Sequence, residues 1–287
     1  MLRVLWAILA LIAILATTLG FLGPWLGMAD AFAVIRFPAV LALALLLLPV
    51  MRKPWLVLPA LALSAFGLVS TLAPFVEAQA PGPVTLYQKN LSFRMADRSA
   101  LLADIQATMP DIITLQEVTE AHRTEIFAAL SEAYPTQAFC PFAGVGGTAV
   151  LSRWPAATPP VCPVAKGATV QPLSTPYGRI TAISVHLHWP WPYGQRAQLE
   201  ALIPELQGLT GSVLLGGDFN MVPWGWPVTA TAKATRTERA GPPAMSFLIE
   251  GLLPIPIDHA FAPGGGQIER RPKLGSDHFG LLARLQP

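Results

Sequence analysis

Hydrophobic positions are distributed in two different ways along the chain. Residues 1–76 contain three almost uninterrupted apolar runs, at about 4–22, 32–51 and 55–75, with short polar or proline-containing breaks between them. Each run is close to the length of about 20 residues that a helix needs to cross the hydrocarbon core of a bilayer. The pattern therefore predicts a bundle of about three transmembrane helices within residues 1–76.

A different pattern follows residues 77–83, a segment with two prolines and one glycine that predicts a linker. From residue 84 onward, short apolar runs alternate with stretches of helical periodicity. The predicted strands are 84–91, 111–116, 147–152, 179–188, 212–217, 255–261 and 280–285, and the predicted helices are 99–109, 121–133 and 195–209. Strands separated by helices predict sheets with helices on their outer faces. Residues 84–287 are expected to form one domain.

The amino-acid composition also differs between residues 1–76 and the rest of the chain. Hydrophobic residues make up 53% of the chain and charged residues 13%, which is more apolar than an average soluble protein. Residues 1–76 hold few of the charges, and the rest of the chain carries 15 basic and 16 acidic residues, a net charge of −1. Domains that bind a nucleic-acid backbone usually carry a marked basic excess. Charge alone therefore gives no indication of nucleic acid.

The basic residues beside the apolar runs predict an orientation. Arg3 precedes the first run, and Arg52 and Lys53 lie between the second and the third. Because basic residues in short flanks stay in the cytoplasm, we expect residues 77–287 on the external side of the membrane. Cleavage of the first run as a signal peptide is the alternative, and it would leave this orientation unchanged.

Two cysteines, Cys140 and Cys162, lie in the part predicted to be external. A disulfide forms readily in an oxidising compartment, so the two residues are candidates for one. Their spacing does not decide between a disulfide and two buried thiols, because proximity in space cannot be read from sequence.

Polar residues gather at the ends of the predicted strands. Asp218 and Asn220 follow strand 212–217, and residues two apart on an extended chain point to the same face. Glu117 follows strand 111–116, where a carboxylate suits a hard cation such as Mg²⁺. The other candidates, in chain order, are Asn90, His186, Asp258, Asp277 and His278. Attack of water on an anionic phosphodiester needs charge neutralisation and an aligned water, so this set predicts metal-dependent phosphoester hydrolysis.

The same residues, in this order, resemble the endonuclease/exonuclease/phosphatase superfamily with the deoxyribonuclease I-like fold. The resemblance covers most of residues 84–285 and rests on Asn90, 115–117, 217–220 and 276–278. It implies an α+β fold in which a two-layer β-sandwich of mixed sheets is flanked by helices, with the site at one edge. Segments 217–224 and 256–259 are similar to membrane-anchored bacterial members, which implies a multi-pass protein of the bacterial inner membrane with a periplasmic or extracellular catalytic domain.

The resemblance also implies roles in metal binding and water activation. Glu117 and Asn90, together with Asp277, are expected to hold Mg²⁺, with Mn²⁺ or Ca²⁺ as alternatives. Asp218 is expected to align or deprotonate the attacking water, and Asn220 to hold that water or a phosphate oxygen.

Further roles concern the phosphate itself. His278, acting with Asp277, is expected to serve as a base or as a charged stabiliser, and Asp258 to orient another group of the site. His186 is expected to contact the phosphate. Ser92 departs from the pattern, because abasic-site endonucleases carry Asp at this place, and this weakens the interpretation as a repair nuclease.

The substrate is left open by the sequence. Arg270, Arg271 and Lys273 precede the last motif and are candidates to bind substrate phosphates. A nuclease acting outside the cytoplasm is the favoured hypothesis, and a phospholipid or phosphoinositide headgroup phosphoesterase is the alternative. A third hypothesis is an inactive, membrane-linked binding module. The expected partners are a phosphodiester substrate and the lipids around the N-terminal helices; no protein partner is inferred.

Overall fold

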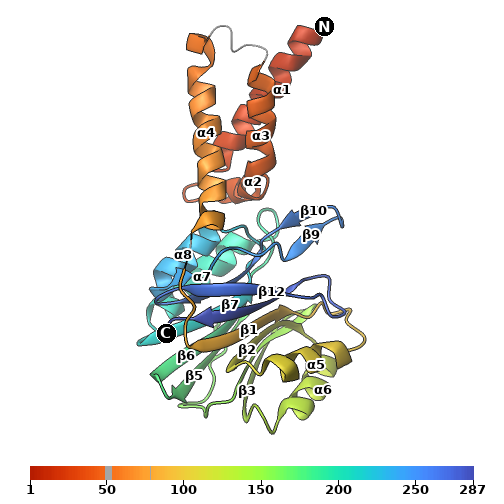
Figure 1. The fold of residues 1–287 in the computed structure, drawn as a ribbon, viewed down its shortest axis with the longest axis vertical. Helices are drawn as coiled ribbons and strands as arrows, with labels where there is room; N and C mark the ends of the chain where they lie inside the picture. The colour runs from red at the N-terminus through yellow and green to blue at the C-terminus, as the bar shows by residue number, and fades with distance from the viewer. Residues whose placement is uncertain (49–53, 78) are drawn as a thin grey trace.

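The computed structural model describes residues 1–48, 54–77 and 79–287. A bundle of helices formed by the N-terminal residues projects from one end of a domain built on two β-sheets (Figure 1). The basic pair Arg52 and Lys53, on which the predicted membrane orientation partly depends, lies outside the described residues, as do the end of the second predicted span and one residue of the linker.

The bundle contains fewer candidate spans than the sequence predicts. Its helices are α1 (Leu2–Leu19), α2 (Asp30–Val34), α3 (Arg36–Leu47) and α4 (Pro54–Val76), with the short 3-10 helix η1 (Gly27–Ala29) before α2. Among the described residues, Val57–Val76 is long and apolar enough to cross a bilayer. Residues 27–47 add a second candidate only if two helices bent by 68° count as one span. The prediction of three spans is therefore reduced to one or two.

The break in the second predicted span has a local cause. The helix is interrupted at Ile35, and the buried guanidinium of Arg36 turns inward to donate a hydrogen bond to the carbonyl oxygen of Gly20. A helix of 12 residues, the length of α3, is about 18 Å long. This length falls short of the roughly 30 Å of a hydrocarbon core.

The first sheet has six strands in the order β12-β13-β1-β2-β4-β3. Its strands are β1 (Val84–Asn90), β2 (Ile112–Val118), β3 (Thr136–Ala143), β4 (Gly146–Ser152), β12 (Gly266–Arg271) and β13 (Gly280–Leu285). Strands β1 and β2 are parallel, and the other neighbours are antiparallel, so the sheet is mixed.

The second sheet has five strands in the order β5-β6-β7-β11-β8. Its strands are β5 (Ala168–Thr175), β6 (Gly178–His186), β7 (Ser212–Asp218), β8 (Glu238–Arg239) and β11 (Asp258–Ala262). A separate hairpin pairs β9 (Phe247–Ile249) with β10 (Leu253–Ile255). The predicted strand 255–261 is thus divided between β10 and β11. Pro256, which has no N–H for a ladder bond, lies at the division.

Three apolar layers hold the domain together. Between the sheets, Leu86 and Val150 of the first sheet share a fully buried cluster with Ile180 and Leu214 of the second. Helices α5 (Ser99–Thr108) and α6 (Glu120–Leu130) cover the outer face of the first sheet, and α7 (Gln195–Gln207) and α8 (Trp226–Thr235) cover that of the second. The predicted α+β fold, with mixed sheets flanked by helices, is confirmed.

One disulfide and one packing contact join segments that are distant in the sequence. Cys140 of β3 and Cys162 form a disulfide, with their Cα atoms 5.4 Å apart. The helical bundle packs directly on the sheet domain, because Ala33 contributes to the core cluster around α7 and α8, and Trp224 Nε1 donates a 2.8 Å hydrogen bond to its carbonyl oxygen. The division into residues 1–76, linker 77–83 and domain 84–287 stays a prediction.

Candidate functional site

The topology brings the predicted residues to one edge of the sandwich. Asn90 ends β1, His186 ends β6 and Asp218 ends β7, and each of these strands has a parallel partner that ends at the same edge. Asp258 starts the antiparallel β11, directly opposite Asp218 in the register. A pocket of about 290 Å³ at this edge is lined by six of the predicted residues: Glu117, His186, Asp218, Asn220, Asp277 and His278.

A buried histidine–carboxylate pair forms the centre of the site. Asp258 Oδ2 lies 2.9 Å from His278 Nδ1, and Asp258 Oδ1 accepts a 2.7 Å hydrogen bond from Gln88. The ring of Phe247 packs against the His278 ring, with the centroids 4.7 Å apart. Burial acts to lower the pKa of His278, but the charges of Asp258 and Asp218 outweigh it and raise this pKa to about 9. The imidazole is therefore charged at neutral pH.

The pKa of Asp258 is shifted downward, opposite to the upward shift of the His278 pKa. Burial opposes its ionisation, yet the His278 charge and the hydrogen bonds from His278, Ser246 and Gln88 hold the pKa of Asp258 below its usual value. Both of its carboxylate oxygens have hydrogen-bond partners in the described structure. This arrangement fixes the orientation of the His278 ring, with Nδ1 toward Asp258 and Nε2 toward Asp218 at the pocket.

Asp218 is the second buried carboxylate of the site. It accepts hydrogen bonds of 2.8 Å from Asn90 Nδ2 and from the backbone N–H of Asn220, and its Oδ2 lies 3.8 Å from His278 Nε2. Burial raises the pKa of Asp218 to about 7, against the lowering effect of the His278 charge. A carboxylate whose pKa is near the working pH is suited to accept a proton from water.

His186 lies across the pocket from these groups. Its Nε2 is 3.6 Å from Asp218 Oδ2 and 4.0 Å from Glu117 Oε1. Burial, with a further effect of the His278 charge, lowers the pKa of His186 to about 3. A neutral imidazole at this place can donate a hydrogen bond to a phosphate oxygen without adding charge.

Backbone geometry at the site differs from the extended chain that the sequence suggests. Strand β7 ends at Asp218, and Asn220 has a φ of 47°, so the two residues form a turn closed by the Asp218 carboxylate. Asn tolerates the left-handed region better than most residues. Glu117 also has a positive φ, 54°, at a bulge between β2 and β4. Bulges redirect side chains near active sites, and here the bulge turns Glu117 into the pocket.

The oxygen atoms at the pocket fit a hard divalent cation. Glu117 Oε1 is 3.3 Å from Asn90 Nδ2, and Glu117 Oε2 accepts a 2.7 Å hydrogen bond from the backbone N–H of Phe93. Asp277 is exposed at the mouth of the same pocket. Carboxylates that remain accessible to water are the ligands that Mg²⁺ prefers, because it keeps several of its waters.

A second group of side chains also lies close enough to hold a cation. The ligand atoms of Asp218, Asp258 and His278 are within 4.8 Å of one another. A cation bound by all three would compete with the hydrogen bonds that already engage both carboxylate oxygens of Asp258. The half-buried Glu117 and the exposed Asp277 line the same pocket and have no such mutual hydrogen bond to give up.

The predicted basic residues do not reach the pocket. Arg271 forms ion pairs with Asp104 and Glu269, away from the lining. Arg270 and Lys273 lie over the ring of Phe279, at 4.3 and 5.3 Å from its centroid. No Lys or Arg is among the described residues that line the catalytic pocket.

Several supporting residues escaped the sequence analysis. Gln88 links Gln116 and Asp258 by hydrogen bonds of 2.8 and 2.7 Å, and Ser246 Oγ accepts the backbone N–H of Asp258 at 3.1 Å. Lys89 is fully buried, and its Nζ donates hydrogen bonds to the carbonyl oxygens of His278 and Pro272 at 2.6 and 3.2 Å. Consecutive polar residues at the end of an otherwise apolar strand were the available signal for Gln88 and Lys89.

Comparison with known proteins shows the family of the chain. A model of the Endonuclease/Exonuclease/phosphatase family matches residues 88–278, and the chain belongs to this family. Members of the family are metal-dependent phosphoesterase hydrolases, and the protein is an enzyme of this type. No curated protein gives a significant match.

Solved structures share the fold at low sequence identity. An endonuclease/exonuclease/phosphatase from Beutenbergia cavernae is 17% identical with a TM-score of 0.56, covering 71% of this chain and 72% of that one. D. rerio TDP2 in complex with a single-strand DNA product is 12% identical with a TM-score of 0.55, covering 70% and 97%. Sphingomyelinase C from Streptomyces griseocarneus is 15% identical with a TM-score of 0.51, covering 71% and 99%. These likenesses establish the fold and leave the substrate open.

Proposed function

We propose that the protein is a divalent-metal-dependent phosphodiesterase in which Asp218 activates the attacking water and His278 stabilises the phosphate. The observation that carries this proposal is the arrangement of Asp258, His278 and Asp218 at one sheet edge, with the His278 ring charged at neutral pH. Asp218 is expected to accept the proton of a water aligned with the phosphorus atom. Asn220, Asp277 and His186 line the same pocket and are proposed to contact that water or the phosphate oxygens.

The electrostatics favour one of the two roles considered for His278. A histidine whose pKa is about 9 carries its proton at pH 7 and cannot accept another. It can donate a hydrogen bond from Nε2 to the phosphate oxygen on which charge develops, and donors fixed in advance are effective in this task. We therefore assign His278 as the charged stabiliser and Asp218 as the base.

Glu117, Asn90 and Asp277 are the residues proposed to hold the cation, with Mg²⁺ as the favoured ion. When bound, a divalent cation supplies charge neutralisation at a phosphoryl oxygen and a template for the substrate. Asn90 has a second task, because its amide nitrogen contacts both Glu117 and Asp218 and so fixes the two carboxylates relative to each other.

The lining of the pocket favours a lipid headgroup over nucleic acid as the substrate. Phe142, Leu187, Trp189 and Phe247 supply apolar walls, and the predicted basic residues lie elsewhere. A polyanion would gain little from such a pocket, because nucleic-acid binding depends on several phosphate contacts to Lys or Arg. Trp189 and the exposed Tyr193 keep a nuclease as the second candidate, since aromatic rings at the mouth can stack on bases.

Anchoring of the enzyme in a bacterial inner membrane is part of the proposal. Helix α4 is apolar and long enough to cross a bilayer, with the bent α2–α3 pair as a further candidate span. The disulfide between Cys140 and Cys162 supports an external catalytic domain, because disulfides persist in oxidising compartments.

The test compares three substrates with the full chain in detergent micelles, because the bundle packs on the catalytic domain. Phospholipid vesicles, single-stranded DNA and duplex DNA are each incubated with Mg²⁺ or with EDTA, alongside His278→Ala. Release of a phosphorylated headgroup that needs both Mg²⁺ and His278 is the expected result. Cleavage of DNA alone would move the function to a nuclease, and turnover by His278→Ala equal to the wild type would refute the site.

A further inference from the structure

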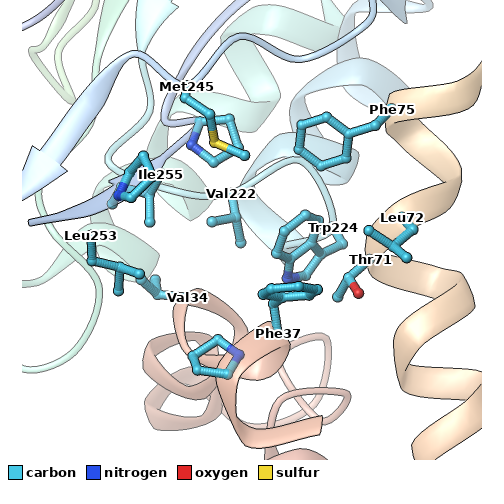
Figure 2. Close-up of a pocket in the computed structure, with 13 residues that line it drawn as sticks. Val34, Phe37, Thr71, Leu72, Phe75, Val222, Trp224, Met245, Leu253 and Ile255 are labelled. Atoms are coloured by element: carbon cyan, nitrogen blue, oxygen red, sulfur yellow. The ribbon is translucent and has the colours of Figure 1, made fainter. Parts of the chain in front are cut away.

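A second cavity lies at the junction between the helical bundle and the catalytic domain. We call it the junction cavity; its volume is about 230 Å³. Figure 2 shows its lining side chains around one space, with Phe37 and Leu72 from the bundle and Val222, Met245 and Leu253 from the domain. Small-molecule sites usually measure about 300–1,000 Å³, so this space suits a slender segment rather than a whole ligand.

The described walls of the junction cavity are largely apolar and offer no free side-chain donor. Among the described lining residues, Thr71 and Trp224 carry side-chain donors, and both are occupied. Thr71 donates to the carbonyl oxygens of Gly67 and Leu68 at 3.0 Å, and Trp224 donates to that of Ala33 at 2.8 Å. A polar ligand would find no free side-chain donor among these residues, and an ordered water needs about two to four polar partners. The chemistry of the cavity therefore selects an alkyl chain.

The rim of the cavity continues into the apolar surface of the bundle. Phe37, Leu72 and Leu253 line the cavity and are also 39–43% exposed. Along the helices, the exposed Leu41 of α3 and Val69 of α4 extend the same surface away from the domain. In a membrane this surface faces lipid chains, so a chain can enter the cavity without crossing water.

The junction cavity and the catalytic pocket share a wall. Phe247 lines the catalytic pocket, while Ile255, its partner in the β9–β10 register, lines the junction cavity. Similarly, Asn220 lines the catalytic pocket and Val222, two residues later, lines the junction cavity. Phe247 and Ile255 are directly paired in an antiparallel hairpin, so their Cα atoms are about 5 Å apart. One lipid molecule is long enough to reach both spaces.

We infer that the junction cavity binds one acyl chain of a bilayer phospholipid and so presents the phosphoester of that lipid to the catalytic pocket. This inference rests on the proposed function, because it names how the substrate is held.

The test fills the cavity with a larger side chain. Leu253→Trp acts from the domain side and Leu72→Trp from the α4 side. Their matched controls are Leu252→Trp and Val69→Trp, which change exposed neighbours outside the lining. The full chain is assayed on vesicles of phosphatidylglycerol and phosphatidylethanolamine, and on bis(p-nitrophenyl) phosphate, which has no acyl chain. Lipid retained by the purified protein is measured by mass spectrometry.

We expect both filling variants to retain less phospholipid and to lose at least about tenfold in kcat/KM on vesicles, the effect of about two buried methylene groups. Turnover of the soluble diester should stay at the level of the controls. Equal lipid retention and equal vesicle turnover in filling and control variants would overturn the inference, as would retention of an apolar peptide in place of lipid. If Leu253→Trp loses soluble turnover, its fold is disturbed and Leu72→Trp decides.

Turnover of the soluble diester tests the proposed function, and lipid retention tests the acyl-chain site, so the two can fail separately. A wild-type enzyme that hydrolyses neither vesicles nor the soluble diester contradicts the proposed function, while its lipid retention still reports on the cavity. A wild-type enzyme that hydrolyses the soluble diester and retains no lipid supports the proposed function and refutes the acyl-chain site.

Discussion

The catalytic pocket and the junction cavity share a wall but differ in chemistry: buried charged groups define the pocket, and apolar side chains line the cavity. In the pocket, Asp218, Asp258 and His278 are almost completely buried, and hydrogen bonds compensate for the loss of water around their charges. In the junction cavity, the side-chain donors of Thr71 and Trp224 bond to carbonyl oxygens of the protein. Binding there is therefore expected to depend on the shape and volume of the cavity. Changes of one atom should therefore be severe in the pocket, and only changes of volume should matter in the cavity.

The largest effect is expected for Asp218→Asn. The substitution keeps the shape of the side chain and removes the carboxylate that accepts the proton of water. Loss of a general base lowers the rate by about 10²- to 10⁴-fold, and we expect this loss in kcat at saturating Mg²⁺. Steady-state turnover of a soluble diester is the measurement, with the exposed Glu132→Gln as the control. A variant that keeps a tenth or more of the activity would argue against Asp218 as the base.

The next effect concerns the cation. Asn90→Ala removes the amide that positions both Glu117 and Asp218, and groups that orient metal ligands contribute about 10- to 100-fold to affinity. The concentration of Mg²⁺ at half-maximal activity should rise by this factor, and titration calorimetry should give the same change in Kd. An unchanged Mg²⁺ requirement would move the metal site away from Glu117.

A smaller effect is expected for Lys89→Met, which leaves the buried carbonyl oxygen of His278 and the partly buried one of Pro272 without their donor. Unsatisfied buried groups cost about 1–3 kcal/mol, so the free energy of unfolding should fall by this amount. Thermal unfolding of the full chain measures it, with Lys233→Met on the exposed face of α8 as the matched control. Equal unfolding temperatures for the two variants would show that Lys89 does not hold the segment around His278.

The sequence was informative where chemistry follows directly from local structure. Strand 280–285 was predicted with the observed bounds because a short apolar run between turns has few alternatives. Glu117 and Asp218 were placed at strand ends because they follow short apolar runs, and His278 was singled out because residues 276–278 resemble a family motif. In contrast, β3 and β5 were missed: each contains a proline, Pro141 and Pro172, which favours a loop interpretation.

Long-range contacts set the limit of the prediction. Arg36 falls within the second predicted span, 32–51, but its contact with Gly20 depends on how two helices pack, which the apolar pattern does not encode. Lys89 reads as an ordinary strand residue, since the carbonyl oxygen of His278 that holds it lies 189 positions away in the chain. Arg271 was predicted at the substrate and instead pairs with Asp104 of α5.

The most direct test of the account is the pH dependence of kcat/KM for the wild type and Asp258→Asn. The pKa of His278 is raised to about 9, so its charge is present at neutral pH and is lost as the pH rises through 9. Wild-type activity should therefore fall above about pH 9. In Asp258→Asn the main raising charge is gone while burial still lowers the pKa, so this fall should move to lower pH by about one unit or more. An alkaline limb at the same pH in both enzymes would contradict a charged His278 held by Asp258.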